Sequence, residues 1–242
     1  MGLPKPTPQI SAVPSGYQII IDPDAFISTA AKFLARKLVA LTNIRHGSIA
    51  LSGGSTPGPI YQKISQHKGI DWSRLHIFFT DERMIPHDDP ESNYHLARET
   101  LLDRVPIPKE QIHPMPVEAQ DGIPPARAYA NILPTSIDIL VLGIGEDGHT
   151  ASLFPHSPAL NSEEAVAQTY SPLPPFERLS ITPTVIKSAQ LMVTLVRGPQ
   201  KNLALHHALA NTTSVDEWPA RIARKGVWIV GRDVLMTPIK NT

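Results

Sequence analysis

The chain of 242 residues contains no cysteine. This absence excludes disulfide bonds, thiolate nucleophiles and metal sites built from cysteine. Neither sign of charge prevails, because 22 Lys and Arg residues balance 22 Asp and Glu residues. A neutral chain without a basic run gives no indication of binding to nucleic acid or to an anionic membrane surface. An anionic ligand would therefore have to meet a local cluster of positive charge.

Long apolar runs are missing as well. No stretch approaches the roughly 18 apolar residues that a membrane-spanning helix needs, and residues 1–8 lack the apolar core of a signal peptide. We therefore expect a soluble, cytoplasmic protein that contacts no membrane. The sequence does not determine the oligomeric state, for which a monomer is our working hypothesis.

Proline is plentiful, with 25 residues. The prolines cluster at residues 4–14, 106–116 and 172–175, close to the ends of apparent helices and strands, a placement typical of loops. We predict that residues 1–14 form a flexible, proline-rich tail. We also predict that residues 15–242 form a single α/β domain.

Short apolar runs alternate with segments of helical periodicity along the whole chain. The predicted strands cover residues 17–21, 48–51, 75–79, 137–142, 191–196 and 227–230, and the predicted helices cover residues 24–43, 57–66, 91–104, 124–133 and 200–210. Strands that alternate with helices indicate a doubly wound, mostly parallel sheet with helices on both faces, which is a Rossmann-like α/β fold.

The most informative segment spans residues 142–155, directly after a predicted buried strand. It places Asp147 and His149 two residues apart at the carboxyl end of that strand, where open α/β sheets bind ligands. Imidazole ordinarily titrates near neutral pH, which suits it to proton transfer. We therefore regard this segment as a candidate catalytic site.

The same segment fits the dinucleotide-binding pattern G-x-G-x-x-G through Gly143, Gly145 and Gly148. Two features disfavour a nicotinamide cofactor. Asp147 would place a carboxylate where the pyrophosphate should lie, and residues 165–168, about twenty positions on, lack the acid that binds the ribose.

A second glycine-rich segment follows the strand at residues 48–51. Gly53 and Gly54 permit a tight turn with exposed N–H groups, and Ser55 or Thr56 suits the N-cap of a helix that begins at Pro57. Helix N-termini bind phosphate through free N–H donors and partial positive charge. An ordinary capped helix after a turn would give the same pattern.

This second segment also resembles the nucleophile elbow G-x-S-x-G of serine hydrolases, although Pro57 replaces the last glycine. A serine hydrolase remains an alternative. It would require His149 close to Ser55 and an acid that orients the histidine.

Three ionisable residues, Asp81, Glu82 and Arg83, follow the predicted strand at residues 75–79. Ionisable side chains are not buried without partners, so this strand end is either a solvated turn or part of a site.

Further cations occur in the second half of the chain at Arg178, Arg197 and Lys201. They could bind a phosphate, or they could simply lie on the surface. The histidines show no metal-binding spacing, and we expect no metal site.

Taken together, these segments resemble the 6-phosphogluconolactonase family, within the wider glucosamine-6-phosphate isomerase/deaminase superfamily. Arg83 after Asp81 and Glu82, and the residues that follow His149, are typical of the lactonase branch rather than the deaminase branch. Thr80 is an unusual residue before Asp81. The motifs that carry the resemblance are residues 51–57, 80–86 with 88–94, 143–155, and 177–182 with Lys201.

The resemblance implies hydrolysis of a small sugar-phosphate lactone, 6-phospho-D-glucono-1,5-lactone, to 6-phospho-D-gluconate in the oxidative pentose phosphate pathway, with no metal or organic cofactor. Under this hypothesis, His149 is the general base that activates water. Asp147 or Asp81 orients the histidine, and Arg83 stabilises charge on the carbonyl oxygen or holds sugar hydroxyls. The residues expected to hold the phosphate are Gly53, Gly54, Ser55, Thr56, Arg178 and Lys201.

Two other functions remain open at this point. A deaminase would release ammonia from glucosamine 6-phosphate. A sugar-phosphate-binding module would bind without turnover, although the presence of Asp81, Asp147 and His149 argues against a site that has lost its chemistry.

Overall fold

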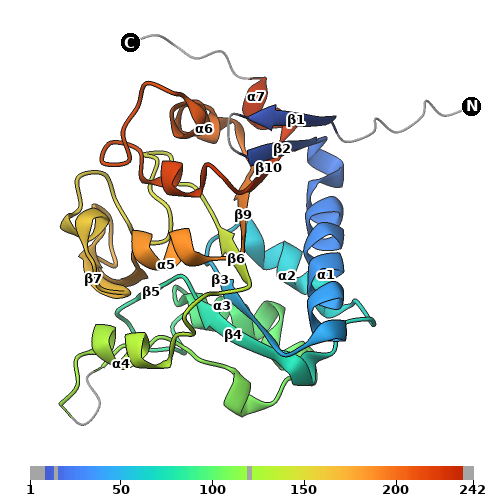
Figure 1. The fold of residues 1–242 in the computed structure, drawn as a ribbon, viewed down its shortest axis with the longest axis vertical. Coiled ribbons are helices and arrows are strands. Elements are labelled where there is room, and N and C mark those ends of the chain that lie inside the picture. Colours follow the sequence, from blue (N-terminus) through green and yellow to red (C-terminus); the bar gives the residue numbers. More distant parts are fainter. Residues whose placement is uncertain (1–8, 14–15, 119–121, 237–242) are drawn as a thin grey trace, which may run out of the picture.

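The computed structural model describes residues 9–13, 16–118 and 122–236, and its main sheet has the predicted α/β architecture (Figure 1). Six strands are parallel, and β1 pairs with β2 in the antiparallel direction at one edge. The strands lie in the order β1 (Gln9–Val13), β2 (Gly16–Ile21), β10 (Val227–Gly231), β9 (Leu191–Val196), β6 (Ile139–Leu142), β3 (Gly47–Leu51) and β4 (Leu75–Phe79).

The direction in which the chain winds reverses between β3 and β6. From β3 the chain proceeds outward to β4, and it then returns to β6 on the other side of β3. The two strands are neighbours, since Ile49 pairs with Ile139. In open parallel sheets such a reversal leaves a crevice at the carboxyl ends of the two strands, where ligands bind. The glycine-rich segments after β3 and β6 both begin at this crevice.

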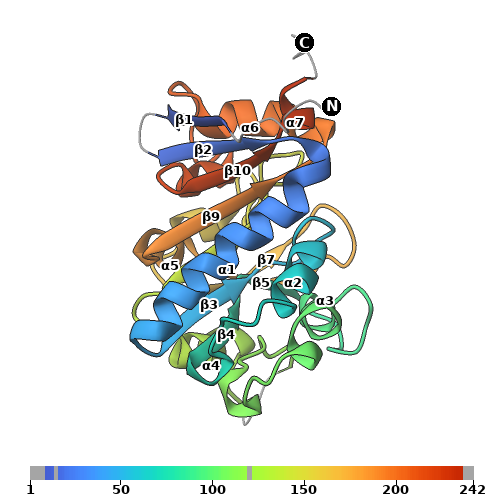
Figure 2. The same cartoon turned by 90° about the vertical axis from the view of Figure 1, so that its right-hand side faces the viewer.

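Helices cover both faces of the main sheet (Figures 1 and 2). Helix α1 crosses one face, and its buried residues Phe26, Ala30, Leu34 and Leu38 recur every four positions, as a helix packed on a sheet requires. On the opposite face lie α5 and α6. The helices are α1 (Phe26–Ile44), α2 (Pro57–Ser65), α3 (Asn93–Thr100), α4 (Pro125–Ile132), α5 (Pro183–Ser188), α6 (Asn202–Leu209) and α7 (Arg232–Leu235).

A second, three-stranded antiparallel sheet was not predicted. It consists of β5 (Asp81–Arg83), β8 (Glu177–Ile181) and β7 (Val166–Tyr170) in that order. Its central strand β8 aligns Arg178 directly opposite Arg83 on β5. The small sheet therefore joins two of the sequence motifs, which lie about a hundred residues apart.

Two sequence predictions need correction. Residues 9–13, expected in a flexible tail, form strand β1 against β2, while residues 1–8 and 14 lie outside the described residues. The helix predicted over residues 91–104 ends at Thr100 and is followed by a separate 3-10 turn, Leu102–Arg104. Leu101 leaves the helical conformation, and this change buries both Leu101 and Leu102.

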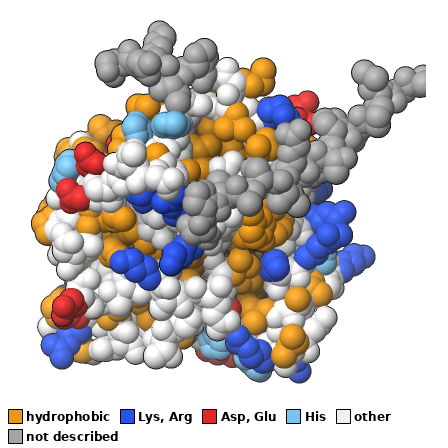
Figure 3. Space-filling view, turned by 45° about the horizontal axis from the view of Figure 1, so that its top comes forward, with side chains coloured by type: hydrophobic (Ala, Val, Ile, Leu, Met, Phe, Trp, Pro, Cys, Tyr) orange, Lys and Arg blue, Asp and Glu red, His pale blue; other side chains and the backbone are white. Residues whose placement is uncertain are grey.

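Within the described part of the chain, no helix combines the length and the apolar character that crossing a membrane demands. The face shown in Figure 3 carries Lys and Arg side chains in several separate groups among hydrophobic and neutral ones. Positive charge on this face is thus dispersed rather than gathered into one continuous surface.

Candidate active site

A cleft of about 630 Å³ opens at the carboxyl ends of β3, β4 and β6. The structure brings every residue proposed for the site to the walls of this one cleft, although they come from five separate stretches of sequence. These residues are Gly53, Gly54, Ser55, Thr56, Asp81, Arg83, Asp147, His149, Arg178 and Lys201.

The loop after β6 holds an imidazole–carboxylate pair. His149 Nδ1 lies 2.6 Å from Asp147 Oδ1, and the same carboxylate oxygen accepts the His149 backbone N–H at 3.1 Å. Both side chains are about one-third exposed, at 35% and 38%. Of the two acids that could orient His149, the structure places Asp147 in contact with it, whereas Asp81 is hydrogen-bonded elsewhere.

The protonation state of Asp147 fixes the tautomer of His149. Burial disfavours the carboxylate, but the hydrogen bond and charge of His149 outweigh burial and lower the pKa of Asp147 below its ordinary value. An ionised carboxylate can only accept hydrogen bonds. The proton of a neutral His149 therefore resides on Nδ1, and Nε2 carries the lone pair that can accept a proton.

Glycine is required where this pair folds back on its own loop. A Cβ atom on Gly145 would lie 2.1 Å from His149 Nδ1 and 2.4 Å from Asp147 Oδ1. Gly145 N–H donates to His149 O at 2.9 Å. These contacts make the loop compact and leave no room for a side chain. Gly145 therefore makes space for protein groups rather than for a pyrophosphate.

Asp81 occupies another part of the cleft wall and is buried. Its carboxylate accepts hydrogen bonds from Thr80 Oγ1 at 2.9 Å and from Ser152 Oγ at 2.7 Å. Ser152 lies three residues after His149, so this bond joins the end of β4 to the loop that carries His149. The hydroxyl of Thr80, the unusual residue of the motif, thus has a defined partner.

Glu82 is not among the residues that line the cleft, and it organises the start of α3. Only 1% of the residue is exposed, and its carboxylate accepts from Ser92 Oγ and from the backbone N–H groups of Arg83, Asn93 and Tyr94, at 2.7 to 3.0 Å. Burial raises the pKa of Glu82 above its ordinary value even though these donors oppose the shift. Glu82 is therefore a structural acid.

Arg83 and Arg178 face each other across β5 and β8 on the cleft wall. Burial, followed by the charge of Arg83, lowers the pKa of Arg178 from its ordinary value. Like charges placed opposite each other destabilise a sheet. Among the described residues, neither guanidinium forms a salt bridge with a carboxylate. The side-chain hydrogen bonds of this pair go to backbone carbonyls instead: Arg178 Nε donates to Pro175 O at 2.7 Å, and Arg83 Nη1 donates to Glu91 O. The pair is suited to an anionic ligand.

The loop after β3 presents free donors to the same cleft. Among the described residues, nothing accepts a hydrogen bond from the backbone N–H groups of Gly53, Gly54, Ser55 or Thr56. Thr56 precedes α2 but makes no side-chain capping bond. Gly54 has a φ of 101°, and no atom lies within 4 Å of where its Cβ would be. The loop therefore has backbone donors that are available to a ligand in the cleft.

The geometry required of a serine hydrolase is not met in this loop. Asp147 supplies the acid on Nδ1 that a triad needs, but Ser55 is exposed and, among the described residues, makes no hydrogen bond with His149.

Two further cations lie on the wall of the cleft. Lys201 is half-buried there, and Arg197 is exposed. Both line the same cleft as the loop with free N–H donors.

Two cleft residues carried no separate signal in the sequence. Asn93 is 3% exposed, its Nδ2 donates to Asp81 O at 2.8 Å, and its Oδ1 would lie 1.7 Å from a Cβ on Gly53. Ser152 uses its N–H, hydroxyl and carbonyl in bonds to Ser180, Asp81 and Thr169. Their positions within the motifs at 88–94 and 143–155 were the only available signal.

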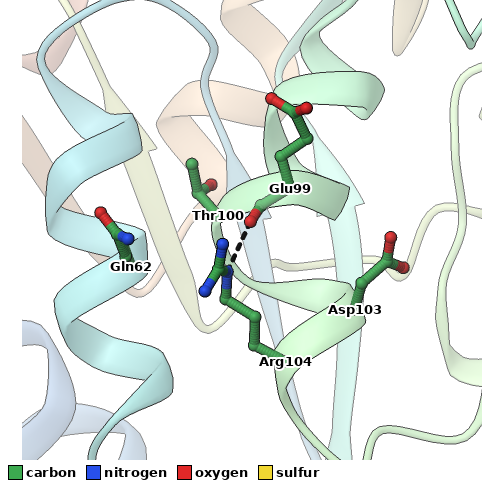
Figure 4. Close-up of a pocket in the computed structure, with 5 residues that line it drawn as sticks. All are labelled: Gln62, Glu99, Thr100, Asp103 and Arg104. Carbon is green, nitrogen blue, oxygen red and sulfur yellow. Dashed lines mark hydrogen bonds between the residues drawn. The ribbon is translucent and has the colours of Figure 1, made fainter.

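A second hollow, of about 560 Å³, lies between α2 and α3 (Figure 4). Arg104 turns back so that its Nε donates to Glu99 O at 2.5 Å. Four of the five lining side chains are exposed, and none belongs to a motif. The hollow is lined by Gln62, Glu99, Thr100, Asp103 and Arg104.

Comparisons with known proteins confirm the family resemblance that the motifs indicate. Residues 21–230 match the family described as Glucosamine-6-phosphate isomerases/6-phosphogluconolactonase. The chain is 36% identical over 214 residues to a 6-phosphogluconolactonase from Synechocystis sp., covering 84% of this chain and 88% of that protein. It is 35% identical over 240 residues to a 6-phosphogluconolactonase from Mycobacterium tuberculosis, covering 90% and 96% respectively.

Solved structures lead to the same family. The fold is similar to the crystal structure of 6-phosphogluconolactonase from Thermotoga maritima, with a TM-score of 0.79 and 27% sequence identity, covering 88% of this chain and 98% of that one. Because the family match spans most of the sheet and every motif of the cleft, the chain belongs to the glucosamine-6-phosphate isomerase/6-phosphogluconolactonase family.

Proposed function

We propose that this protein hydrolyses 6-phospho-D-glucono-1,5-lactone to 6-phospho-D-gluconate by attack of a water molecule that His149 activates. The single observation that carries the proposal is the 2.6 Å contact between His149 and the ionised Asp147 in a cleft that also presents free N–H donors. Family membership and the names of the relatives support the choice of substrate.

Proton transfer follows from the tautomer of His149. Nε2 takes a proton from water while the water oxygen bonds to the lactone carbonyl carbon, and Asp147 stabilises the imidazolium that forms. The tetrahedral intermediate then collapses, the bond from the carbonyl carbon to the ring oxygen breaks, and the imidazolium returns its proton to the leaving ring oxygen. The products are a carboxylic acid and a free hydroxyl, with no change of oxidation state.

The phosphate group is bound at the other side of the cleft. The N–H groups of the loop after β3 donate to its oxygens, and Arg178 and Lys201 supply positive charge. Binding energy from a phosphate remote from the carbonyl aligns the lactone for attack.

Asp81 and Arg83 contact the sugar ring in this proposal. The Asp81 carboxylate keeps free lone pairs after accepting from Thr80 and Ser152, so it can accept from sugar hydroxyls. Arg83 has a buried Nε without a partner among the described residues. Its guanidinium holds a hydroxyl or stabilises charge on the carbonyl oxygen.

The test is turnover of freshly made lactone by the purified protein, in an assay coupled to a dehydrogenase for the product. Such lactones hydrolyse unaided, so the rate must be compared with a reaction without protein. Acceleration that grows in proportion to protein concentration supports the proposal. A rate equal to the background would contradict it and would favour a binding module.

The serine-nucleophile alternative makes a different prediction for one variant. If Ser55 attacked the carbonyl, Ser55→Ala would abolish turnover, and an acyl-enzyme could be trapped. In the proposed mechanism, Ser55→Ala mainly raises KM. Release of ammonia from glucosamine 6-phosphate would instead support a deaminase.

A further inference from the structure

The loop that carries His149 packs against a segment without any recognisable motif, residues 214–220. Ala220 N–H donates to Gly148 O at 2.9 Å, and His156 N–H donates to Asp216 O at 2.9 Å. The His156 ring also lies 2.6 Å from the Asp216 carboxylate. The segment therefore contacts the loop both before and after the cleft residues Ala151 and Ser152.

The closest contact is made by the indole of Trp218. Gly148, between Asp147 and His149, has a φ of 84°, and a Cβ on it would lie 2.4 Å from Cε3 of Trp218. The indole thus occupies the space that any side chain at this position would need. The indole therefore packs against Gly148, the residue that links Asp147 to His149.

The indole also packs against the ring of His207. The ring of His207 stacks on it, with centroids 4.2 Å apart and an interplanar angle of 16°. Burial, followed by the charge of His206, lowers the pKa of His207 below its ordinary value, so the ring that stacks is neutral at pH 7. The backbone N–H of Trp218 donates to Ser214 O at 3.1 Å, and Arg221 Nη1 donates to His207 O at 3.0 Å.

We infer that Trp218 is a positioning residue, which holds the Gly148 peptide so that Asp147 and His149 keep their hydrogen bond. Without the indole, the left-handed conformation at Gly148 has room to relax, and relaxation would rotate the two side chains apart. The kinetic consequence of this role rests on the proposed function, whereas the contact itself does not.

The first experiment compares kcat, KM and the pH profile of kcat for Trp218→Ala, Trp218→Phe and Asp147→Asn. Trp218→Ala should lower kcat by about 10²-fold, the order expected when a catalytic group is misplaced by about 1 Å, with little change in KM. Its pH profile should move toward that of Asp147→Asn. Trp218→Phe, which keeps a flat ring, should restore most of the rate.

Trp72 provides a control, because it is a buried tryptophan in the 3-10 turn before β4, whereas the half-buried Trp218 fills the space beside Gly148. Trp72→Ala should lower the unfolding temperature yet leave kcat and the pH profile unchanged. A folded Trp218→Ala protein with the kcat and the pH profile of the wild type would overturn the inference.

A double-mutant cycle on unfolding stability tests the contact without any turnover. Gly148→Ala should destabilise the wild type strongly. It should destabilise the Trp218→Ala protein less, because the clash with the ring is gone and only the strain of a side chain at a φ of 84° remains. Equal effects in the two backgrounds would overturn the contact and with it the positioning role. Absence of lactone turnover in the wild type would instead overturn the proposed function.

Discussion

The loop after β3 and the loop after β6 both begin with glycines at the carboxyl end of a buried parallel strand, and they line the same cleft. In the first loop, the space beside Gly54 is open and the backbone N–H groups are free. In the second, the space beside Gly145 and Gly148 is filled by His149, Asp147 and Trp218. Gly54 therefore leaves room for a ligand in the first loop, whereas Gly145 and Gly148 leave room for the protein's own side chains in the second.

This difference separates two tasks that the sequence patterns alone do not distinguish. The loop after β3, which we call the open loop, can bind an anion through its backbone, because no protein group competes for the donors. The loop after β6, which we call the filled loop, can hold an acid–base pair in one geometry, because its atoms are packed. If the division is correct, changes in the filled loop should act on kcat, and changes in the open loop should act on KM.

The largest effect is expected for His149→Asn. Removal of the general base should lower kcat by about 10²–10⁴-fold, while KM stays within about threefold because binding groups are unchanged. Steady-state kinetics on freshly made lactone, after subtraction of the spontaneous rate, measure both constants. A folded His149→Asn variant with the kcat of the wild type would contradict the assignment of the general base to the filled loop.

The next effect compares two glycines two residues apart. Gly145→Ala places a Cβ 2.1 Å from His149 Nδ1, whereas Gly143→Ala meets nothing within 4 Å. Gly145→Ala should therefore lower kcat by roughly 10–100-fold through displacement of the pair, and Gly143→Ala should change it little. Similar kcat values for the two variants would show that packing around Gly145 does not control the pair.

A smaller effect is expected in the open loop. Gly54→Ala introduces no steric contact, but a side chain at a φ of 101° is strained by about 1–3 kcal/mol. The loop should shift and lose alignment with the phosphate, which raises KM by roughly tenfold or less and leaves kcat close to that of the wild type. A fall in kcat with unchanged KM would contradict this division, because it would mean that the open loop takes part in the chemical step.

The smallest effect concerns stability against pH. The lowered pKa of Asp147 means that its pairing stabilises the folded state above the ordinary Asp value of about 3.9 and loses this contribution as pH falls through the folded value. The difference in unfolding temperature between wild type and Asp147→Asn should thus shrink from pH 7 to pH 3. Ser55→Ala is the control, because the open loop holds no such charge.

A difference for Asp147→Asn that stays constant across this pH range would contradict the ion pairing of the filled loop. A pH-dependent difference for Ser55→Ala would contradict its use as an uncharged reference. Thermal unfolding followed by circular dichroism provides both measurements.

The main sheet was predictable because its strands are short apolar runs between helical segments. Strands β3 and β6 are buried along their whole length, as in any parallel sheet covered on both faces. Such strands consist largely of apolar residues, and these apolar runs are visible in the sequence. The crevice at the strand ends followed from the same pattern, and its residues were found through motifs.

The small sheet and the supports of the site were not predictable in this way. β5 is three residues long and charged, so it has no strand pattern of its own, and it pairs with β8 about a hundred residues away. Asn93, Ser152 and Trp218 act through contacts that exist only in the folded chain. The choice between Asp81 and Asp147 as partner of His149 also required the structure.

The central claim is that the open loop binds the phosphate while the filled loop carries out the chemistry. One measurement tests it directly: the ratio of kcat/KM for the phosphorylated lactone to kcat/KM for the unphosphorylated D-glucono-1,5-lactone, in wild type and Gly54→Ala. The account predicts that Gly54→Ala lowers this ratio because only the phosphorylated substrate loses contacts. An unchanged ratio, with both substrates affected equally, would contradict it.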